Sequence, residues 1–247
     1  MINALRSEFR KLLSVRTTYF FVLSSIVGIG IINGYVYGYR ASSDLLARPD
    51  FLSYGAATSM TIVGSFLVIV GMLLFTNEYR YNTILYSLTT VTRNRFLAAK
   101  TIAVIVSSLA LSLLVLFSAS LFSWIGVTLS GREAALSTLQ FSSNWWAALA
   151  YGLGSGLLAL VISIFMRNQV GALVAYILGI PILEQLLSLL IKSNAKFLPF
   201  NALSQLGTIP NSAYATLSKQ EALTVVGCWI LGGFVIAWLW FTRRDAN

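Results

Sequence analysis

The sequence contains no histidine and only eight acidic residues among its 247 positions. The lack of histidine excludes Ser-His-Asp triads, histidine-ligated metals and imidazole proton transfer. The acidic residues are scattered singly, so a catalytic pair of carboxylates is hard to assemble. Ser155 lies in a Gly-Leu-Gly-Ser-Gly sequence but has no base to activate it. We therefore expect no catalytic residues and no metal site, and interpret these small residues as helix-packing positions.

Cysteine and charge are scarce as well. The single cysteine, Cys228, excludes an internal disulfide, and we expect it to pack in the core. Charged residues make up 10% of the chain, against roughly a quarter in soluble domains. The mean hydropathy is +0.79. These values indicate a membrane protein.

Six apolar segments are long enough to cross a bilayer as helices, which takes about 20 residues each. They are residues 17–39, 52–75, 98–129, 145–166, 170–191 and 222–241. The third is long enough to be tilted or to continue beyond the bilayer. Residues 1–16 are charged and carry no signal-peptide pattern, and spans of this length argue against a barrel. We predict an all-α integral membrane protein with a single transmembrane domain over residues 1–247.

The distribution of basic residues predicts the orientation. With both termini inside the cell, eleven of the seventeen Lys and Arg residues fall on the inner side and six on the outer side. Cytoplasmic connections of membrane proteins carry an excess of Lys and Arg. We therefore expect a multi-pass protein of the cell membrane with both termini cytoplasmic.

Residues 1–16 have the pattern of an amphipathic helix. Phe9 belongs to an apolar series with three- and four-residue spacing, while Arg6, Glu8, Arg10 and Lys11 occupy the other face. Such a helix lies naturally in the headgroup plane. Two interpretations stay open: an anchor that only sets topology, or an elbow helix that contacts a cytoplasmic partner.

Two stripes of small residues favour close helix packing. Gly30, Gly34 and Gly38 are spaced four residues apart in the first span. A comparable stripe in the fifth span consists of Gly171, Ala175 and Gly179. Packing within the chain is the simpler explanation, and an interface between two copies is the alternative.

Glu184 is the one acidic residue well inside a predicted span, close after Pro181, where we expect a kink. Because an intramembrane carboxylate is costly, it indicates either a polar contact near a translocation route or a structural hydrogen bond across helices. Residues 192–221, broken by Pro199, Gly207 and Pro210, are too long for a plain turn and are expected to form short helices in an extracellular loop.

The segment 76–100 is polar, basic and rich in helix-forming residues, between two apolar segments. With residues 1–16 and the six spans, it resembles the permease subunits of ABC type-2 exporters over essentially the whole chain. The residues that match the loop pattern of that family are Glu78, Arg80, Thr83, Arg93 and Lys100. One departure is Val91-Thr92, where many members have a proline before the arginine.

The resemblance implies a mechanism. These permeases contain no ATPase, and this sequence has no phosphate-binding loop. ATP and magnesium would bind to a separate ATPase subunit, docked on a coupling helix within residues 76–97, with the elbow helix alongside. Arg80, Arg93 and Arg95 would pair with acids of the ATPase, unless they only set topology. Two permeases, identical or paralogous, and two ATPases would form the complex in a bacterial membrane.

The cargo follows from composition. Because the spans carry hardly any fixed charge, we expect an amphipathic or hydrophobic substrate such as a drug, peptide antibiotic or lipid-like molecule. The alternatives are an ion-coupled secondary transporter that depends on Glu184, and a non-transporting sensor or immunity protein. No nucleic-acid partner is expected.

Overall fold

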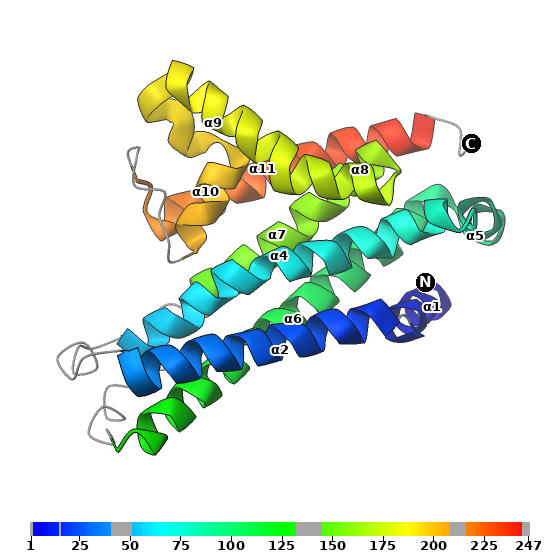
Figure 1. Cartoon of the computed structure of the whole chain (residues 1–247). Helices are drawn as coiled ribbons and strands as arrows, with labels where there is room; N and C mark the ends of the chain where they lie inside the picture. Colours follow the sequence, from blue (N-terminus) through cyan, green and yellow to red (C-terminus); the bar gives the residue numbers. More distant parts are fainter. Residues whose placement is uncertain (1, 15, 41–50, 132–144, 208–215, 244–247) are drawn as a thin grey trace.

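The structure is a computed structural model that describes residues 2–14, 16–40, 51–131, 145–207 and 216–243 (Figure 1). Every regular element in these ranges is a helix. The elements are α1 (Ile2–Ser14), α2 (Arg16–Tyr35), the π-helix η1 (Val36–Arg40), α4 (Phe51–Arg80), α5 (Ile84–Thr90), α6 (Arg93–Leu129), α7 (Trp145–Met166), α8 (Gln169–Val174), the π-helix η3 (Ala175–Gly179), α9 (Ile180–Ile191), the 3₁₀-helix η4 (Lys192–Phe197), α10 (Pro199–Leu206) and α11 (Lys219–Arg243).

Five stretches in the described part of the chain are long and apolar enough to cross a membrane. They are Val22–Arg40, Arg93–Leu129, Trp145–Met166, Gln169–Phe197 and Lys219–Arg243. The predicted all-helical fold is thereby confirmed, with five candidate membrane spans. The remaining predicted span, residues 52–75, lies in α4, and many of its side chains are outside the described residues. That span stays a prediction.

The long helices form a bundle with α4, α6 and α7 in contact at its centre, and α2 packs against α6 and α4 (Figure 1). α6 has 37 residues and is therefore about 55 Å long, which exceeds a hydrocarbon core of about 30 Å. The most apolar stretches of α6 and α7 are 44% and 56% buried, whereas those of Gln169–Phe197 and α11 are only 17% buried. The last two spans therefore lie at the periphery of the bundle.

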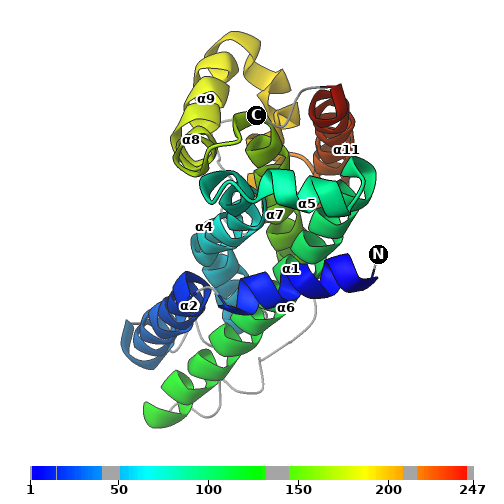
Figure 2. The same cartoon turned by 90° about the vertical axis from the view of Figure 1, so that its right-hand side faces the viewer.

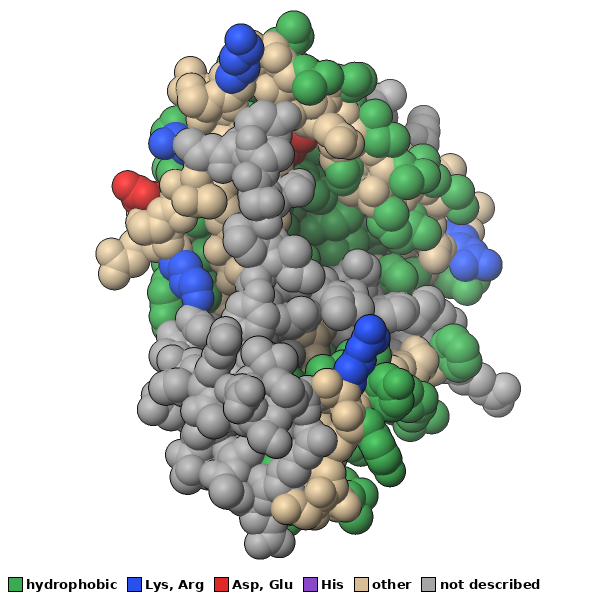
Figure 3. Space-filling view, turned by 60° about the vertical axis from the view of Figure 1, so that its left-hand side comes forward, with side chains coloured by type: hydrophobic (Ala, Val, Ile, Leu, Met, Phe, Trp, Pro, Cys, Tyr) green, Lys and Arg blue, Asp and Glu red, His purple; other side chains and the backbone are tan. Residues whose placement is uncertain are grey.

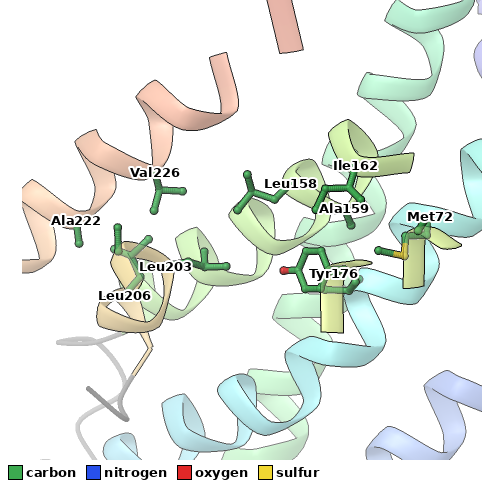
Figure 4. Close-up of a cluster of buried hydrophobic side chains, with 12 residues drawn as sticks. Met72, Leu158, Ala159, Ile162, Tyr176, Leu203, Leu206, Ala222 and Val226 are labelled. Carbon is green, nitrogen blue, oxygen red and sulfur yellow. The ribbon is translucent and has the colours of Figure 1, made fainter. Parts of the chain in front are cut away.

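Buried apolar side chains join the peripheral helices to the centre. One cluster links α7 to α4, η3, α10 and α11, and its labelled members in Figure 4 include Met72, Leu158, Tyr176, Leu203 and Val226. Figure 3 shows a face of the molecule where hydrophobic side chains line a hollow. The fold thus keeps apolar side chains both inside the bundle and on its surface, as a lipid environment requires.

Glycines allow α2 and α6 to pack at backbone distance. A Cβ added at Gly126 in α6 would lie 2.8 Å from the Gly34 carbonyl oxygen, and one at Gly38 would lie 3.2 Å from the Gly126 oxygen. At Gly30 it would lie 3.0 Å from the Phe122 ring. The first glycine stripe therefore packs within the chain. In the second stripe, the nearest atoms to an added Cβ at Gly171 and Gly179 belong to residues 168–175 of the same segment.

Buried serines in the spans donate to carbonyls of their own helices. The Ser155 hydroxyl donates to the Tyr151 carbonyl at 2.7 Å, and Ser112 and Ser163 make equivalent bonds four residues back. Such bonds satisfy the hydroxyl without a partner helix. The expectation for Cys228 was wrong: its side chain is exposed on α11. A small apolar side chain is tolerated on a surface that lies against lipid.

The segment of Pro181 contains a π-helical turn. Proline has no N–H to offer to the carbonyl four residues back, and its ring crowds that carbonyl. The chain forms the π-helix η3 over Ala175–Gly179 immediately before α9. A π-turn is a known way to accommodate such a defect.

We predict that Gly126→Ala destabilises the protein by about 1–3 kcal/mol, because its methyl group would collide with the α2 backbone. Gly28→Ala is the matched control, since a Cβ at Gly28 meets nothing within 4 Å. Both changes gain the same helix propensity, so the difference in stability between the two variants measures the cost of the collision. Thermal unfolding in detergent measures it, and equal stability of the two variants would contradict this account of α2–α6 packing.

Candidate coupling site

One end of the molecule carries α1, α5 and the C-terminal end of α11 (Figures 1 and 2). α4 ends at Arg80, a turn follows with Asn82 at a φ of 52°, and the seven-residue helix α5 leads into α6. Viewed from this end, α1 and α5 lie across the bundle (Figure 2). A seven-residue helix is marginal by itself, so contacts with the rest of the chain must hold α5 in place.

Four charged side chains meet beneath α5, and we call them the ion cluster: Glu8, Lys11, Glu78 and Lys100. The Lys100 Nζ lies 2.5 Å from Glu8 Oε2 and 2.9 Å from Glu78 Oε1. The Lys11 Nζ lies 2.6 Å from Glu78 Oε1 and 3.0 Å from Glu8 Oε1. Each ammonium bridges both carboxylates, so the ion cluster ties α1, α4 and α6 together.

The ion cluster uses nearly all of its hydrogen-bonding capacity. An ammonium has three N–H donors, and Lys100 directs the third to the Leu74 carbonyl at 2.6 Å. The second carboxylate oxygen of Glu78 accepts from the Ser87 hydroxyl of α5 at 2.6 Å. Lys100 is 1% exposed and Glu78 3% exposed. With two charges of each sign, the ion cluster is neutral, as burial of such groups demands.

The contacts within the ion cluster shift the pKa values of Lys11 and Glu78. Partial burial alone would lower the pKa of Lys11, but the hydrogen bond to Glu78 and the charges of Glu8 and Glu78 raise it overall. Burial alone would raise the pKa of Glu78, but the charge of Lys100 and then the hydrogen bond from Lys11 lower it overall. The Glu78 contribution to stability is therefore present above its unfolded pKa and lost as pH falls through the folded pKa.

Aromatic packing joins α11 to the same end. Phe75 of α4, Phe96 of α6 and Phe241 of α11 have ring centroids 5.9–6.3 Å apart. The Arg93 Nη1 donates to the Thr242 carbonyl at 2.7 Å, at the C-terminal end of α11. A guanidinium at this position satisfies a helix-end carbonyl and complements the helix dipole.

The outer face of α5 is exposed and partly apolar. Leu85 and Tyr86 are 54% and 76% exposed, and Tyr81 in the turn before α5 is 65% exposed. On the opposite face, Ile84 is buried and Leu88 packs against the same apolar cluster as Phe75. Because the inner face is fixed by Ile84, Leu88 and Ser87, the outer face is presented in one orientation.

The structure places the predicted coupling residues in two groups. Glu78, Lys100 and Arg93 bond to other parts of this chain and hold the site together. Arg80 and Arg95 are exposed, while Thr83 precedes α5 without a side-chain capping bond. Among the elbow residues, Arg6 and Arg10 are exposed and Phe9 is half-buried.

Glu8 requires a correction. The sequence pattern places it on the polar outer face of the N-terminal helix, but it is 4% exposed and faces Lys100. The buried ammonium supplies a partner that a helical pattern alone cannot reveal. The sequence also did not predict Ser87 and the Leu74 carbonyl as hydrogen-bond partners of these charges. Lys100, in an otherwise apolar run, was the available signal that a buried charge needed partners.

Glu184, in the opposite half of the molecule, binds backbone rather than another charge. Its two carboxylate oxygens accept from the N–H groups of Phe200 and Asn201 at 2.8 and 3.0 Å. These are among the first N–H groups of α10, which the preceding Leu198 cannot cap. The carboxylate therefore caps α10 from α9, a structural bond across helices. Among the described residues, no three Cys, Asp or Glu side chains gather to hold a metal ion.

We predict that Lys100→Met destabilises the protein by about 3–5 kcal/mol, because it leaves two buried carboxylates with a single ammonium. The double variant Lys100→Met, Glu78→Gln should recover most of this loss, since Glu8 and Lys11 then form a neutral pair. Exposed Arg95→Met, the control, should stay within about 0.5 kcal/mol of wild type. Unfolding in detergent measures all three, and a double variant less stable than Lys100→Met would refute the charge balance.

Comparison with protein families gives a match to the family described as ABC-2 family transporter protein, over residues 4–183. No curated protein and no solved structure matches the chain. The matched region includes α1, the ion cluster, α5 and the spans as far as α9. It confirms the resemblance found in the sequence, and it covers more than half of the chain. The chain therefore belongs to the ABC-2 transporter family, as a non-catalytic membrane permease subunit.

Proposed function

We propose that this chain is the permease of an exporter in which a separate ATPase docks on the outer face of α5. The observation that carries the proposal is the exposed surface of Leu85 and Tyr86 on α5 and of Tyr81 in the turn before it, with α5 held from below by the bond between Ser87 and Glu78. Exposed tyrosines at a rigid site are typical binding hot spots. ATP and magnesium bind in the ATPase, because this chain has no phosphate-binding loop.

Force on α5 reaches the spans through the ion cluster. α5 continues into α6, and Ser87 bonds to Glu78 near the end of α4. Lys100 then joins α6 to both α4 and α1. In this proposal, Glu78 and Lys100 are positioning residues that make α1, α4, α5 and α6 move as one unit. Closure of the ATPase pair would tilt this unit and change the access of the route between the spans.

The distribution of buried charge supports an amphipathic or hydrophobic cargo. Among the described residues, the buried charged side chains are Glu8, Glu78, Lys100 and Glu184. The first three neutralise one another with Lys11, and Glu184 is engaged by the α10 backbone. None of these groups remains to compensate a highly charged cargo. The same engagement of Glu184 argues against the ion-coupled alternative, which needs a carboxylate available for ions.

A second permease, identical or paralogous, completes the complex in this proposal. Among the five candidate spans of the described residues, Gln169–Phe197 and α11 are the least covered, at 17% each. Gly30 and Gly34 of α2 and Gly38 of η1 are already packed against α6. The proposed contact between permeases therefore involves the later spans, with α5 of each copy facing the cytoplasm.

The proposed orientation predicts the sides from which two positions can be labelled. Thr89 in α5 and Asn194 in η4 are both exposed and lie at opposite ends of the bundle. In a Cys228→Ser background, an impermeant maleimide added to intact cells should label Asn194→Cys and not Thr89→Cys. Inverted vesicles should reverse the pattern. Labelling of Thr89→Cys from outside would overturn the orientation.

We predict that Tyr86→Ala weakens ATPase binding about tenfold or more and lowers substrate-stimulated ATP hydrolysis, because it removes an exposed anchor. Thermal stability should not change, since the ring packs against little of the chain. Tyr39→Ala is the matched control, an 81% exposed tyrosine in η1 on the other side of the bundle. Co-purification of the ATPase with each tagged chain measures the effect. Absence of any ATPase with wild type, or equal loss with both variants, would contradict the proposal.

A further inference from the structure

A pocket of about 460 Å³ lies beside the coupling site and is not part of the ion cluster. It is lined by Tyr79 and Arg80 at the end of α4, by Arg167 and Asn168 between α7 and α8, and by Gln169 and Val170 at the start of α8. None of these six residues is acidic, and two are arginines. Its volume falls in the ordinary range for small-ligand sites, about 300–1,000 Å³.

Both guanidinium groups are held in place by neighbours. The Arg80 Nη1 donates to the Gln169 Oε1 at 3.1 Å, which bridges α4 and α8, and its Cζ lies 5.6 Å from the Tyr81 ring centroid. The Arg167 Cζ lies 5.6 Å from the Tyr79 ring centroid. Positioned guanidinium groups match the oxygens of a phosphate, to which each can donate two parallel hydrogen bonds.

Arg167 adopts a backbone conformation that costs energy for any residue except glycine. Its φ is 53°, at the C-terminal end of α7, where glycine is the usual residue. An arginine at this position accepts backbone strain, and its side chain lines the pocket. Because glycine would form this turn without strain, the presence of arginine supports a function of its guanidinium group in the pocket.

The surroundings of the pocket indicate a lipid. α4 and α7 end and α8 begins at this level, which is where apolar spans give way to polar chain. Next to the pocket, the side chains of Met166, Val170 and Val174 are 49%, 69% and 50% exposed. A ligand with a phosphate in the pocket would therefore find an apolar surface for acyl chains along α8.

We propose that this pocket binds the phosphodiester of an anionic phospholipid through Arg80 and Arg167. The site is independent of ATPase docking, and in the proposed orientation it faces the cytoplasmic leaflet, where anionic lipids attract basic groups. Lipid binding would join the end of α4 to the start of α8, next to α5. It therefore stabilises the central bundle against the less buried span Gln169–Phe197.

The test is thermal unfolding of the full chain, without ATPase, in neutral detergent with added phosphatidylglycerol or phosphatidylcholine. Phosphatidylglycerol should raise the melting temperature in a saturable manner, and phosphatidylcholine should not. Arg80→Gln and Arg167→Gly should each weaken the apparent affinity about tenfold or more. Arg167→Gly is informative because glycine relieves the backbone strain while removing the charge. If Arg167 served only the turn, this variant would keep the response to phosphatidylglycerol.

Exposed Arg243→Gln, in the last turn of α11 and outside the pocket, is the charge-matched control and should keep the full response to phosphatidylglycerol. Arg80→Lys and Arg167→Lys preserve charge and should keep part of the affinity. They serve as the test if Arg80→Gln or Arg167→Gly fails to fold. Equal stabilisation by phosphatidylcholine, or equal loss in Arg243→Gln, would overturn the proposal.

The source of the phosphate is tested by competition. Inorganic phosphate and glycerol 3-phosphate should fail to displace phosphatidylglycerol at comparable concentrations, because they lack the acyl chains that lie on the apolar surface. Displacement by either would assign the site to a soluble phosphate compound instead. If Arg80→Gln and Arg167→Gly lose ATPase binding but keep the lipid response, the two arginines face acids of the ATPase and the lipid site is refuted.

Discussion

The buried ammonium of Lys100 is the constraint on which the coupling end depends. A lone charge in an apolar interior costs several kcal/mol, so the chain must bring acceptors to all three donors. Those acceptors come from Glu8 in α1 and from Glu78 and Leu74 in α4. Apolar helix faces in lipid can slide past one another at little cost, whereas this set of bonds is satisfied in only one register. The ion cluster therefore sets where α1, α4 and α6 meet.

The position of α5 is a consequence of the same register. Its seven residues would not stay helical alone, and Glu78, already held by two ammonium groups, gives Ser87 a fixed acceptor. Ile84 and Leu88 then enter the apolar cluster of Phe75 and Phe96. The face that remains outside carries Leu85 and Tyr86, next to exposed Tyr81 in the preceding turn. These contacts make α5 rigid relative to the spans, as the proposed docking of an ATPase on it requires.

The sequence was sufficient for the features that depend on local composition. Hydropathy located the spans, the structure supports five of them, and the family match confirms the class of protein. The prediction that Glu8 faces outward was wrong because its partner Lys100 lies 92 residues away, and a helical pattern does not reveal so distant a charge. The prediction that Cys228 is buried was wrong for a related reason, since an apolar run in a membrane protein does not distinguish the core from the lipid-facing surface. The sequence pattern assigned the same role to all the basic residues of 76–100. In the fold, Arg93 and Lys100 bond within the chain, whereas Arg95 is exposed.

The two buried carboxylates outside α1 perform different tasks at different places in the fold. Glu78 binds ammonium groups and fixes the registers of α1, α4, α5 and α6, whereas Glu184 binds backbone N–H groups and joins α9 to α10. Tyr176 strengthens that second junction, because its ring lies 4.7 Å from Phe200 in an edge-on contact. Between these junctions, the span Gln169–Phe197 buries little of its surface and contains the π-helix η3. A span held at its ends and irregular in its middle can change its tilt at smaller cost than α6 or α7. In the proposed transporter, which an ATPase drives from α5, the compact bundle carries the motion and the peripheral span yields to it.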